Sequence, residues 1–244
     1  MKLSQSVVLI TGANRGLGRA LVHTALAAGA RRIYAGARDP QQLAAIVKTA
    51  PDRIIPLALD VTDPASLEAA AARAADTSVL INNAGVLASY NVLTSTREQL
   101  AEDFAINAFG MLAVTKALLP ALERAAAGGE AALANVLSVV SLASMPALGG
   151  YSAAKAAAYS ITQALRGELA AKRIAVHAVF PGPIDTDMVR TFEMAKTSPE
   201  VVAQAIIDGI ERGVEDIYPD PASRDMFTTW QRDPKQLERQ LAGR

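Results

Sequence analysis

The chain has no cysteine and only two histidines, His23 and His177, and these gaps exclude several kinds of chemistry. Without a thiol it forms no disulfide, holds no metal through thiolate and has no cysteine nucleophile. Two histidines far apart in the sequence do not make a histidine-rich metal site. We therefore expect no bound metal.

The chain also lacks an excess of either charge and lacks a long hydrophobic run. Its 24 basic residues balance 24 acidic ones, so no overall field attracts nucleic acid or an anionic membrane. The first apolar stretch, Val7–Ile10, is shorter than a signal peptide requires, and a membrane span needs about 20 apolar residues. We expect a cytoplasmic protein that binds neither nucleic acid nor a membrane.

What is present favours a folded α/β protein. Hydrophobic residues make up 51% of the 244 residues and charged residues 20%, which is typical of a chain with one sizeable core. No Pro/Gly/Ser-rich linker or internal repeat divides the sequence. We predict a single domain over residues 1–244, with 219–244 as a C-terminal tail packed on it or on a partner subunit.

Short apolar runs alternate with longer Ala-rich stretches. Strands are predicted at Val7–Ile10, Arg32–Ala35, Ile54–Leu59, Val79–Ile81, Ala132–Leu137, Ile174–Phe180 and Asp216–Tyr218, and helices near 17–29, 64–75, 97–126, 151–172, 198–212 and 233–241. Runs of Val, Ile and Leu without strict alternation are typical of strands covered on both faces. The alternation of strands and helices predicts a doubly wound, Rossmann-type, mostly parallel seven-stranded sheet with helices on both faces.

A glycine-rich turn, Thr11–Gly18, follows the first strand and opens the first helix. Its glycines permit a tight turn, and the helix N-terminus offers unpaired N–H groups to a pyrophosphate. The spacing is G-x-x-x-G-x-G rather than the general G-x-G-x-x-G, and a plain strand–helix turn is the alternative.

Residues after the second strand indicate which nicotinamide cofactor is preferred. An acidic residue there binds the ribose 2′-hydroxyl, whereas Arg receives a 2′-phosphate. Arg38 follows the neutral Ala37, and Arg15 lies in the glycine loop, so two guanidiniums could meet one phosphate. Asp39 is the competing signal, although it lies one position later and could orient Arg38. We predict NADP(H), with two solvated arginines as the alternative.

Tyr151 and Lys155 lie at i and i+4, on one face of a predicted helix. A free tyrosine has a pKa of about 10, and a nearby ammonium favours its ionised form. Tuned in this way, Tyr151 could exchange a proton with an alkoxide or an alcohol. Taken alone the pair is a weak signal, because Tyr and Lys are both common.

Other polar residues extend this signal. Ser138 ends the predicted fifth strand and could hydrogen-bond a substrate carbonyl, with an ordinary turn serine as the alternative. Asn107 falls inside a helical pattern, where Asn is mildly unfavourable, which indicates a specific partner, with an ordinary helix asparagine as the alternative. Asn82–Gly85 and Phe180–Thr186 each follow a strand, so both reach the carboxyl edge of the sheet, where open α/β folds bind ligands.

The combination resembles a short-chain dehydrogenase/reductase of the compact single-domain type over about residues 5–190. The family's T-G-x-x-x-G-x-G motif matches Thr11, Gly12, Gly16 and Gly18, its N-N-A-G motif matches Asn82–Gly85, and its catalytic Asn-Ser-Tyr-Lys set falls on Asn107, Ser138, Tyr151 and Lys155.

The resemblance implies roles for these residues. Tyr151 would be the acid–base, Ser138 would hold the carbonyl, and Lys155 would bind the nicotinamide ribose and lower the pKa of Tyr151. Asn107 would hold a water in a proton relay. The implied cofactor-binding set is Gly12, Asn14, Arg15, Gly16, Leu17, Gly18, Arg38, Asp60, Val61, Asn83, Ala84, Gly85, Tyr151, Lys155, Pro181, Gly182, Ile184 and Thr186.

The function implied is NADP(H)-dependent reduction of a carbonyl or oxidation of an alcohol; the alternative is a catalytically silent NADP(H)-binding sensor or scaffold. An apolar small-molecule substrate is expected from Leu87, Leu142, Met145, Leu148, Met188 and Phe192. Many tetrameric members end in a V-D-G-G strand, which Glu215–Asp220 does not match. A homo-oligomer is expected, and a dimer through the Ala-rich helix Tyr151–Leu169 is favoured.

Overall fold

The computed structural model describes residues 1–244, which form one parallel seven-stranded sheet. The strands are β1 (Val7–Ile10), β2 (Arg32–Ala37), β3 (Ile54–Ala58), β4 (Val79–Asn82), β5 (Ala131–Val136), β6 (Ile174–Val179) and β7 (Asp216–Ile217). Their order across the sheet is β3-β2-β1-β4-β5-β6-β7. The order reverses between β1 and β4, the point at which doubly wound sheets bind ligands. The predicted fold is confirmed.

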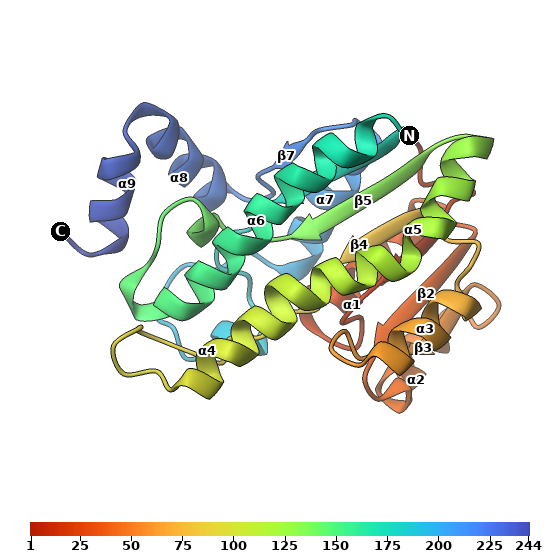
Figure 1. Cartoon of the computed structure of the whole chain (residues 1–244), viewed down its shortest axis with the longest axis horizontal. Coiled ribbons are helices and arrows are strands. Elements are labelled where there is room, and N and C mark those ends of the chain that lie inside the picture. Colours follow the sequence, from red (N-terminus) through yellow and green to blue (C-terminus); the bar gives the residue numbers. More distant parts are fainter.

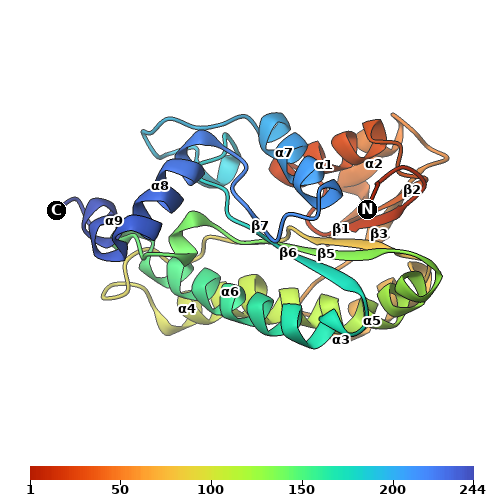
Figure 2. The ribbon, with the colours of Figure 1, turned by 90° about the horizontal axis from the view of Figure 1, so that it is seen from above.

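Helices cover both faces of the sheet, as Figure 2 shows. The first face carries α1 (Gly16–Ala27), α2 (Ala44–Val47) and α7 (Pro199–Glu211), and the second carries α3 (Pro64–Arg73), α4 (Arg97–Phe104), α5 (Met111–Gly128) and α6 (Gly149–Ala170). Successive strand side chains point to opposite faces. Val8 and Ile10 therefore join one core cluster, and Val7 and Leu9 join the other. Burial on both faces explains why the strand sequences read as continuous apolar runs.

The predicted helix over 97–126 is one helical run with an irregularity in its middle. Residues Ala105–Gly110 form a π-helical turn between α4 and α5. Such turns often occur at functional sites, and this one contains Asn107. The run Arg97–Gly128 contains an 18-residue window whose mean hydropathy, 1.5, would suit a membrane span, but half of that window is buried in the protein.

The C-terminal tail is more helical than the sequence analysis predicted. Besides α9 (Pro234–Leu241), which was expected, α8 covers Pro221–Arg232. Asp220 caps α8 and Pro221 occupies its first turn, a start signal that the sequence carried. Both helices pack against the same chain, beyond the carboxyl end of the sheet (Figure 1).

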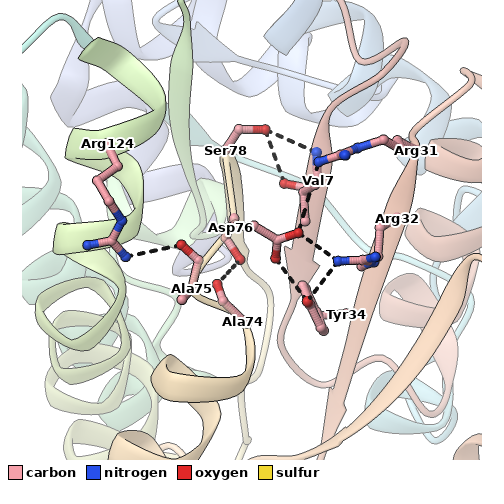
Figure 3. Close-up of polar contacts among 10 residues, drawn as sticks. Val7, Arg31, Arg32, Tyr34, Ala74, Ala75, Asp76, Ser78 and Arg124 are labelled. Atoms are coloured by element: carbon pink, nitrogen blue, oxygen red, sulfur yellow. Dashed lines mark hydrogen bonds and ion pairs between the residues drawn. The ribbon is translucent and has the colours of Figure 1, made fainter. Parts of the chain in front are cut away.

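A polar cluster closes the opposite, amino-terminal edge of the sheet (Figure 3). The Asp76 carboxylate, in the turn before β4, accepts hydrogen bonds from Arg32 Nη1 at 2.7 Å and from the Tyr34 hydroxyl at 2.9 Å. Arg124 of α5 donates to the Ala75 carbonyl at 3.1 Å. Arg32 and Asp76 are partly exposed, so solvent screening keeps the contribution of this ion pair modest. The cluster joins strands β1, β2 and β4 away from the candidate site.

Candidate functional site

The glycine turn adopts a shape that only glycine permits. Gly12 and Gly16 have φ of +65° and +51°, and a Cβ on Gly18 would lie 2.0 Å from the Gly12 carbonyl oxygen. Helix α1 begins directly after Arg15, which places no side-chain cap on the first-turn N–H groups. Those N–H groups and the positive end of the helix are free to receive an anion such as a pyrophosphate.

The Asn82–Gly85 segment fixes this turn from the neighbouring strand. Thr11 Oγ1 accepts hydrogen bonds from the backbone N–H groups of Asn83 and Ala84, both at 2.9 Å. The Asn83 amide donates in return to the carbonyls of Thr11 and Gly12 at 2.9 and 3.2 Å. The Asn83 side chain therefore holds the phosphate-binding turn in place.

Asn82 points away from the site into the core. Its amide donates to Asn135 Oδ1 and Thr115 Oγ1, both at 2.9 Å, and Asn135 donates to Thr162 Oγ1 at 3.0 Å. These buried bonds join β4 and β5 to α5 and α6. The first residue of the N-N-A-G motif is thus a structural one.

A cavity of about 820 Å³ opens at the carboxyl edge of the sheet. Every residue of the predicted site lines it except Asn107: Gly12, Asn14, Arg15, Gly16, Leu17, Gly18, Arg38, Asp60, Val61, Asn83, Ala84, Gly85, Ser138, Tyr151, Lys155, Pro181, Gly182, Ile184 and Thr186. The loop after β6 reaches back to the glycine turn, because a Cβ on Gly16 would lie 3.1 Å from Thr186 Cγ2. Segments distant in the sequence therefore surround one space.

Ser138, Tyr151 and Lys155 meet in this cavity. Ser138 follows β5, and its hydroxyl accepts a hydrogen bond from Val140 N at 3.4 Å. Lys155 Nζ lies 5.7 Å from the centroid of the Tyr151 ring and donates to the Val136 carbonyl at 2.8 Å. Burial lowers the pKa of Lys155 to about 8, and the charge of Asp103 opposes this shift.

The pKa of Tyr151 departs from the sequence-based expectation. Burial raises it well above its ordinary value, and the Asp103 charge adds to the rise. The hydrogen bond with Ser138 acts in the lowering direction but is the smaller effect. The sequence predicted that Lys155 would lower the pKa of Tyr151. The effect of burial is larger, so the pKa of Tyr151 is raised instead. Without a cofactor, Tyr151 is therefore protonated at neutral pH.

Asn107 acts on the loop behind the site. Its Oδ1 accepts from Val86 N at 3.1 Å and its Nδ2 donates to the Val86 carbonyl at 2.9 Å. This buried clamp fixes the chain directly after Gly85. The water relay predicted for Asn107 stays a prediction.

Asp103, one turn before Asn107, is a site residue that the sequence analysis missed. Its carboxylate is fully buried and accepts from Ala88 N and Ser89 N, both at 3.0 Å, and also from the Ser89 hydroxyl. Ser89 in turn packs on Gly150, where a Cβ would lie 2.0 Å from Ser89 Oγ. Asp103 therefore supports the residue adjoining Tyr151. An Asp at a helix-interior position was the available signal.

The two arginines lie where a phosphate could reach them. Arg15 Nη1 lies 3.3 Å from Asp187 Oδ2, and these side chains are 66% and 53% exposed. The ion pair is therefore weak, and Arg15 could leave Asp187 to bind another anion. Arg38 is exposed. Hydrogen bonds from Thr62 hold the pKa of Asp60 below its ordinary value, and the charge of Arg38 lowers it further.

Asp39 does not orient Arg38, contrary to one sequence-based suggestion. Its carboxylate caps the short 3₁₀ helix Pro40–Leu43, accepting from Gln41 N at 2.9 Å and from Gln42 Nε2 at 3.5 Å. The preference of Asp for such N-caps explains its position. Asp39 is thus engaged in a helix cap, whereas the side chain of the neighbouring Arg38 makes no hydrogen bond or ion pair within the protein.

The sequence matches the family model described as short chain dehydrogenase over residues 6–197. It is 35% identical over 200 residues to a short chain dehydrogenase of Monascus ruber, an alignment that covers 77% of this chain and 65% of that protein. A short chain dehydrogenase of Aspergillus terreus is 33% identical, with 78% of this chain and 43% of that protein covered. The chain thus spans about two thirds or less of these two relatives.

Among solved structures, a short chain dehydrogenase from Burkholderia cenocepacia in complex with NADP is 34% identical, with a TM-score of 0.92 and 99% of each chain covered. A short-chain dehydrogenase from Sphingobium yanoikuyae in complex with NADPH is 26% identical, with a TM-score of 0.78 and 95% of each chain covered. The family predicted from the motifs is confirmed.

Proposed function

Because this chain belongs to the short-chain dehydrogenase/reductase family of oxidoreductases, we propose that it transfers a hydride between NADP(H) and a carbonyl or secondary alcohol. The observation that carries the proposal is the cavity itself. Its lining joins an uncapped helix N-terminus at the glycine turn to the trio Ser138, Tyr151 and Lys155. One end suits a dinucleotide phosphate, and the other suits proton transfer to an oxygen.

A nicotinamide dinucleotide fits the residues present. The glycine turn leaves room for a close approach by phosphate, and Asp60 and Val61 line the cavity beyond β3, where the adenine would lie. Pro181, Ile184 and Thr186 would hold the nicotinamide end. When bound, this cofactor supplies or accepts the hydride.

The chain's own residues would manage the oxygen and its proton. In the direction of reduction, the Ser138 hydroxyl donates a hydrogen bond to the substrate carbonyl and holds it in place. Tyr151, kept protonated by burial, donates its phenolic proton to the oxygen as negative charge develops there. The Lys155 ammonium stabilises the phenolate that remains.

This scheme predicts a pH dependence that comes from Lys155. Its pKa of about 8 means that the side chain is charged below that pH and neutral above it. We expect kcat/KM for ketone reduction to fall as pH rises through about 8, because the cation that stabilises the phenolate is lost. Initial rates between about pH 6 and pH 10 would show this fall. A flat profile would contradict the role given to Lys155.

NADP(H) is proposed over NAD(H) because Arg15 and Arg38 are both cationic, exposed and near the cavity. The two relatives of known structure described above hold NADP and NADPH. The weak Arg15–Asp187 pair would exchange for a phosphate contact at little cost.

The test measures oxidation of NADPH and NADH in parallel with a panel of ketones and aldehydes. We expect faster turnover with NADPH, and we expect Arg38→Ala to weaken NADPH binding about ten-fold or more through loss of a charge-assisted bond. Arg19→Ala is the matched control, because Arg19 is an exposed arginine of the first helix that does not line the cavity. An unchanged preference in Arg38→Ala would contradict the assignment. Tight NADPH binding without any turnover would favour the sensor.

Three further proposals concern the oligomeric state, the location and the substrate. The dimer through the exposed Ala-rich face of α6 and the cytoplasmic location both stay predictions. The apolar substrate is supported by hydrophobic residues that line the same cavity as Ser138, among them Leu87, Met145, Leu148, Met188 and Phe192. Leu142 is not among its lining residues.

A further inference from the structure

The C-terminal helices α8 and α9 lie beside the segment that joins Ser138 to Tyr151 (Figures 1 and 2). Helix α8 packs on the 3₁₀ turn Val139–Ser141, directly after Ser138. Helix α9 borders Leu142–Pro146 through Pro234, Lys235 and Glu238. The pair therefore flanks the reacting end of the cavity and lies away from the glycine turn.

A buried carboxylate fixes the start of this helix pair. Asp220 is fully buried; its Oδ2 accepts from Gly182 N at 2.8 Å and its Oδ1 accepts from Ser223 N at 2.8 Å. The same side chain therefore caps α8 and holds the loop after β6, which lines the cavity. A buried carboxylate with well-placed donors is costly to disturb, so α8 has a defined position.

Stacked aromatic rings fix the direction of α8. Phe180, at the end of β6, stacks on Tyr218 with ring centroids 5.1 Å apart, and Tyr218 stacks on Phe227 of α8 at 4.0 Å. Because Phe180 adjoins Pro181 and Gly182 in sequence, polar and aromatic contacts hold α8 to one segment of the site.

From this position the helices contribute apolar side chains to the cavity. Met226 of α8 and Leu241 of α9 line it together with Met145, Leu148, Met188 and Met194. Four of the chain's six methionines thus surround one space. Methionine is flexible and polarizable, and it lets a surface adapt to ligands of different shape.

The acidic residues to consider on this side are Asp187, Asp220 and Glu102, of which Asp187 and Glu102 line the cavity. Asp187 lies between Arg15, at 3.3 Å, and Arg190, at 3.6 Å. Asp220 is satisfied by Gly182 and Ser223. No cation among the residues around Ser138 lines the cavity to receive a substrate carboxylate, since Lys155 faces Tyr151 and the Val136 carbonyl.

Resting on the proposed function, we infer that α8 and α9 of the same chain form the outer wall of the carbonyl pocket. The pocket accepts uncharged, apolar ketones or aldehydes of varied shape, and Met226 and Leu241 determine the largest substituent that fits. Ser138 and Tyr151 form the polar floor, and the methionines form an adaptable apolar wall.

The test compares a series of ketones that carry one constant group and one alkyl or aryl group of increasing size. In Met226→Ala and in Leu241→Ala, we expect the ratio of kcat/KM for the bulkiest ketone to that for the smallest to rise about ten-fold or more, because space is created. Met226→Trp should shift the ratio in the opposite direction. Gln240→Ala, an exposed neighbour of Leu241, is the control and should leave the ratio unchanged.

A second readout separates this inference from the proposed function. Binding of the same ketones is measured at equilibrium, with NADPH present, in a Tyr151→Phe background that cannot turn them over. Size-dependent changes in binding without turnover in the wild type would support the pocket wall and overturn the proposed function. Ratios and binding that stay unchanged in all three pocket variants would overturn the wall. Tighter binding of a carboxylate-bearing ketone than of its uncharged analogue would overturn the substrate class.

Discussion

Tyr151→Phe is expected to lower kcat for ketone reduction by about 10²–10⁴-fold while leaving NADPH affinity within a few-fold of wild type. The phenolic oxygen is the only atom lost, and in our scheme it delivers the proton to the substrate oxygen. Burial holds Tyr151 in its protonated form, so its phenol has a proton to give at neutral pH. The serine hydroxyl holds the carbonyl, and the lysine lies behind the ring.

Single-turnover and steady-state rates with NADPH would measure the loss, and titration of NADPH would measure the affinity. Tyr159→Phe is the matched control, since Tyr159 lies on the same helix but packs edge-on against Phe180, with ring centroids 4.9 Å apart, and does not line the cavity. Tyr159 is partly exposed and has no part in the proposed chemistry. Retention of wild-type kcat in Tyr151→Phe would assign the proton to another group.

Asp103→Ala is expected to lower the free energy of unfolding by about 3 kcal/mol, because it leaves buried backbone N–H groups without an acceptor. Ala88 N and Ser89 N both donate to this carboxylate, and Ser89 is itself fully buried. The Ser89 side chain presses on Gly150, so loosening it also disturbs the start of α6 and the position of Tyr151. We expect kcat to fall more than NADPH affinity.

Urea denaturation would measure the loss of stability, with the midpoint and the slope fitted separately. Glu102→Ala is the control for stability, because Glu102 is the adjacent acidic residue and is exposed. A similar loss of unfolding free energy in Asp103→Ala and Glu102→Ala would show that helix α4 is sensitive to any substitution. The specific role of the buried Asp103 carboxylate would then be rejected. A normal stability in Asp103→Ala would reject it as well.

The sheet could be predicted from sequence because its strands are buried on both faces. Runs such as Val7–Ile10 then show no alternation of apolar and polar residues. Because a helix lies between successive strands, the strands are connected as parallel βαβ units. Strand ends were placed to within about two residues, which is usual because the last residues of a strand carry no separate signal. The gathering of the loops after the strands at one edge could also be predicted, since parallel strands deliver their following residues to one edge.

Other features depend on contacts that no short pattern encodes. Asp103 has no motif of its own, and its importance comes from a loop 14 residues earlier that folds over it. The pKa of Tyr151 was expected to fall because its neighbour Lys155 is cationic, but burial of both groups reverses the balance. Helix α8 is held beside the cavity partly by the bond between Asp220 and Gly182, residues 38 positions apart.

The two chain ends lie at opposite edges of the molecule, which matters for handling the protein (Figure 1). The Met1 amino group donates to the Glu211 carbonyl at 3.3 Å, beyond the amino-terminal edge of the sheet. Leu241, close to the other terminus, lines the cavity. An affinity tag or fluorescent fusion attached after Arg244 would therefore begin three residues beyond a side chain that lines the cavity, and we expect it to interfere with substrate binding. Attachment ahead of Met1 lies away from Leu241 and is the better choice for assays and for immobilising the protein on a surface.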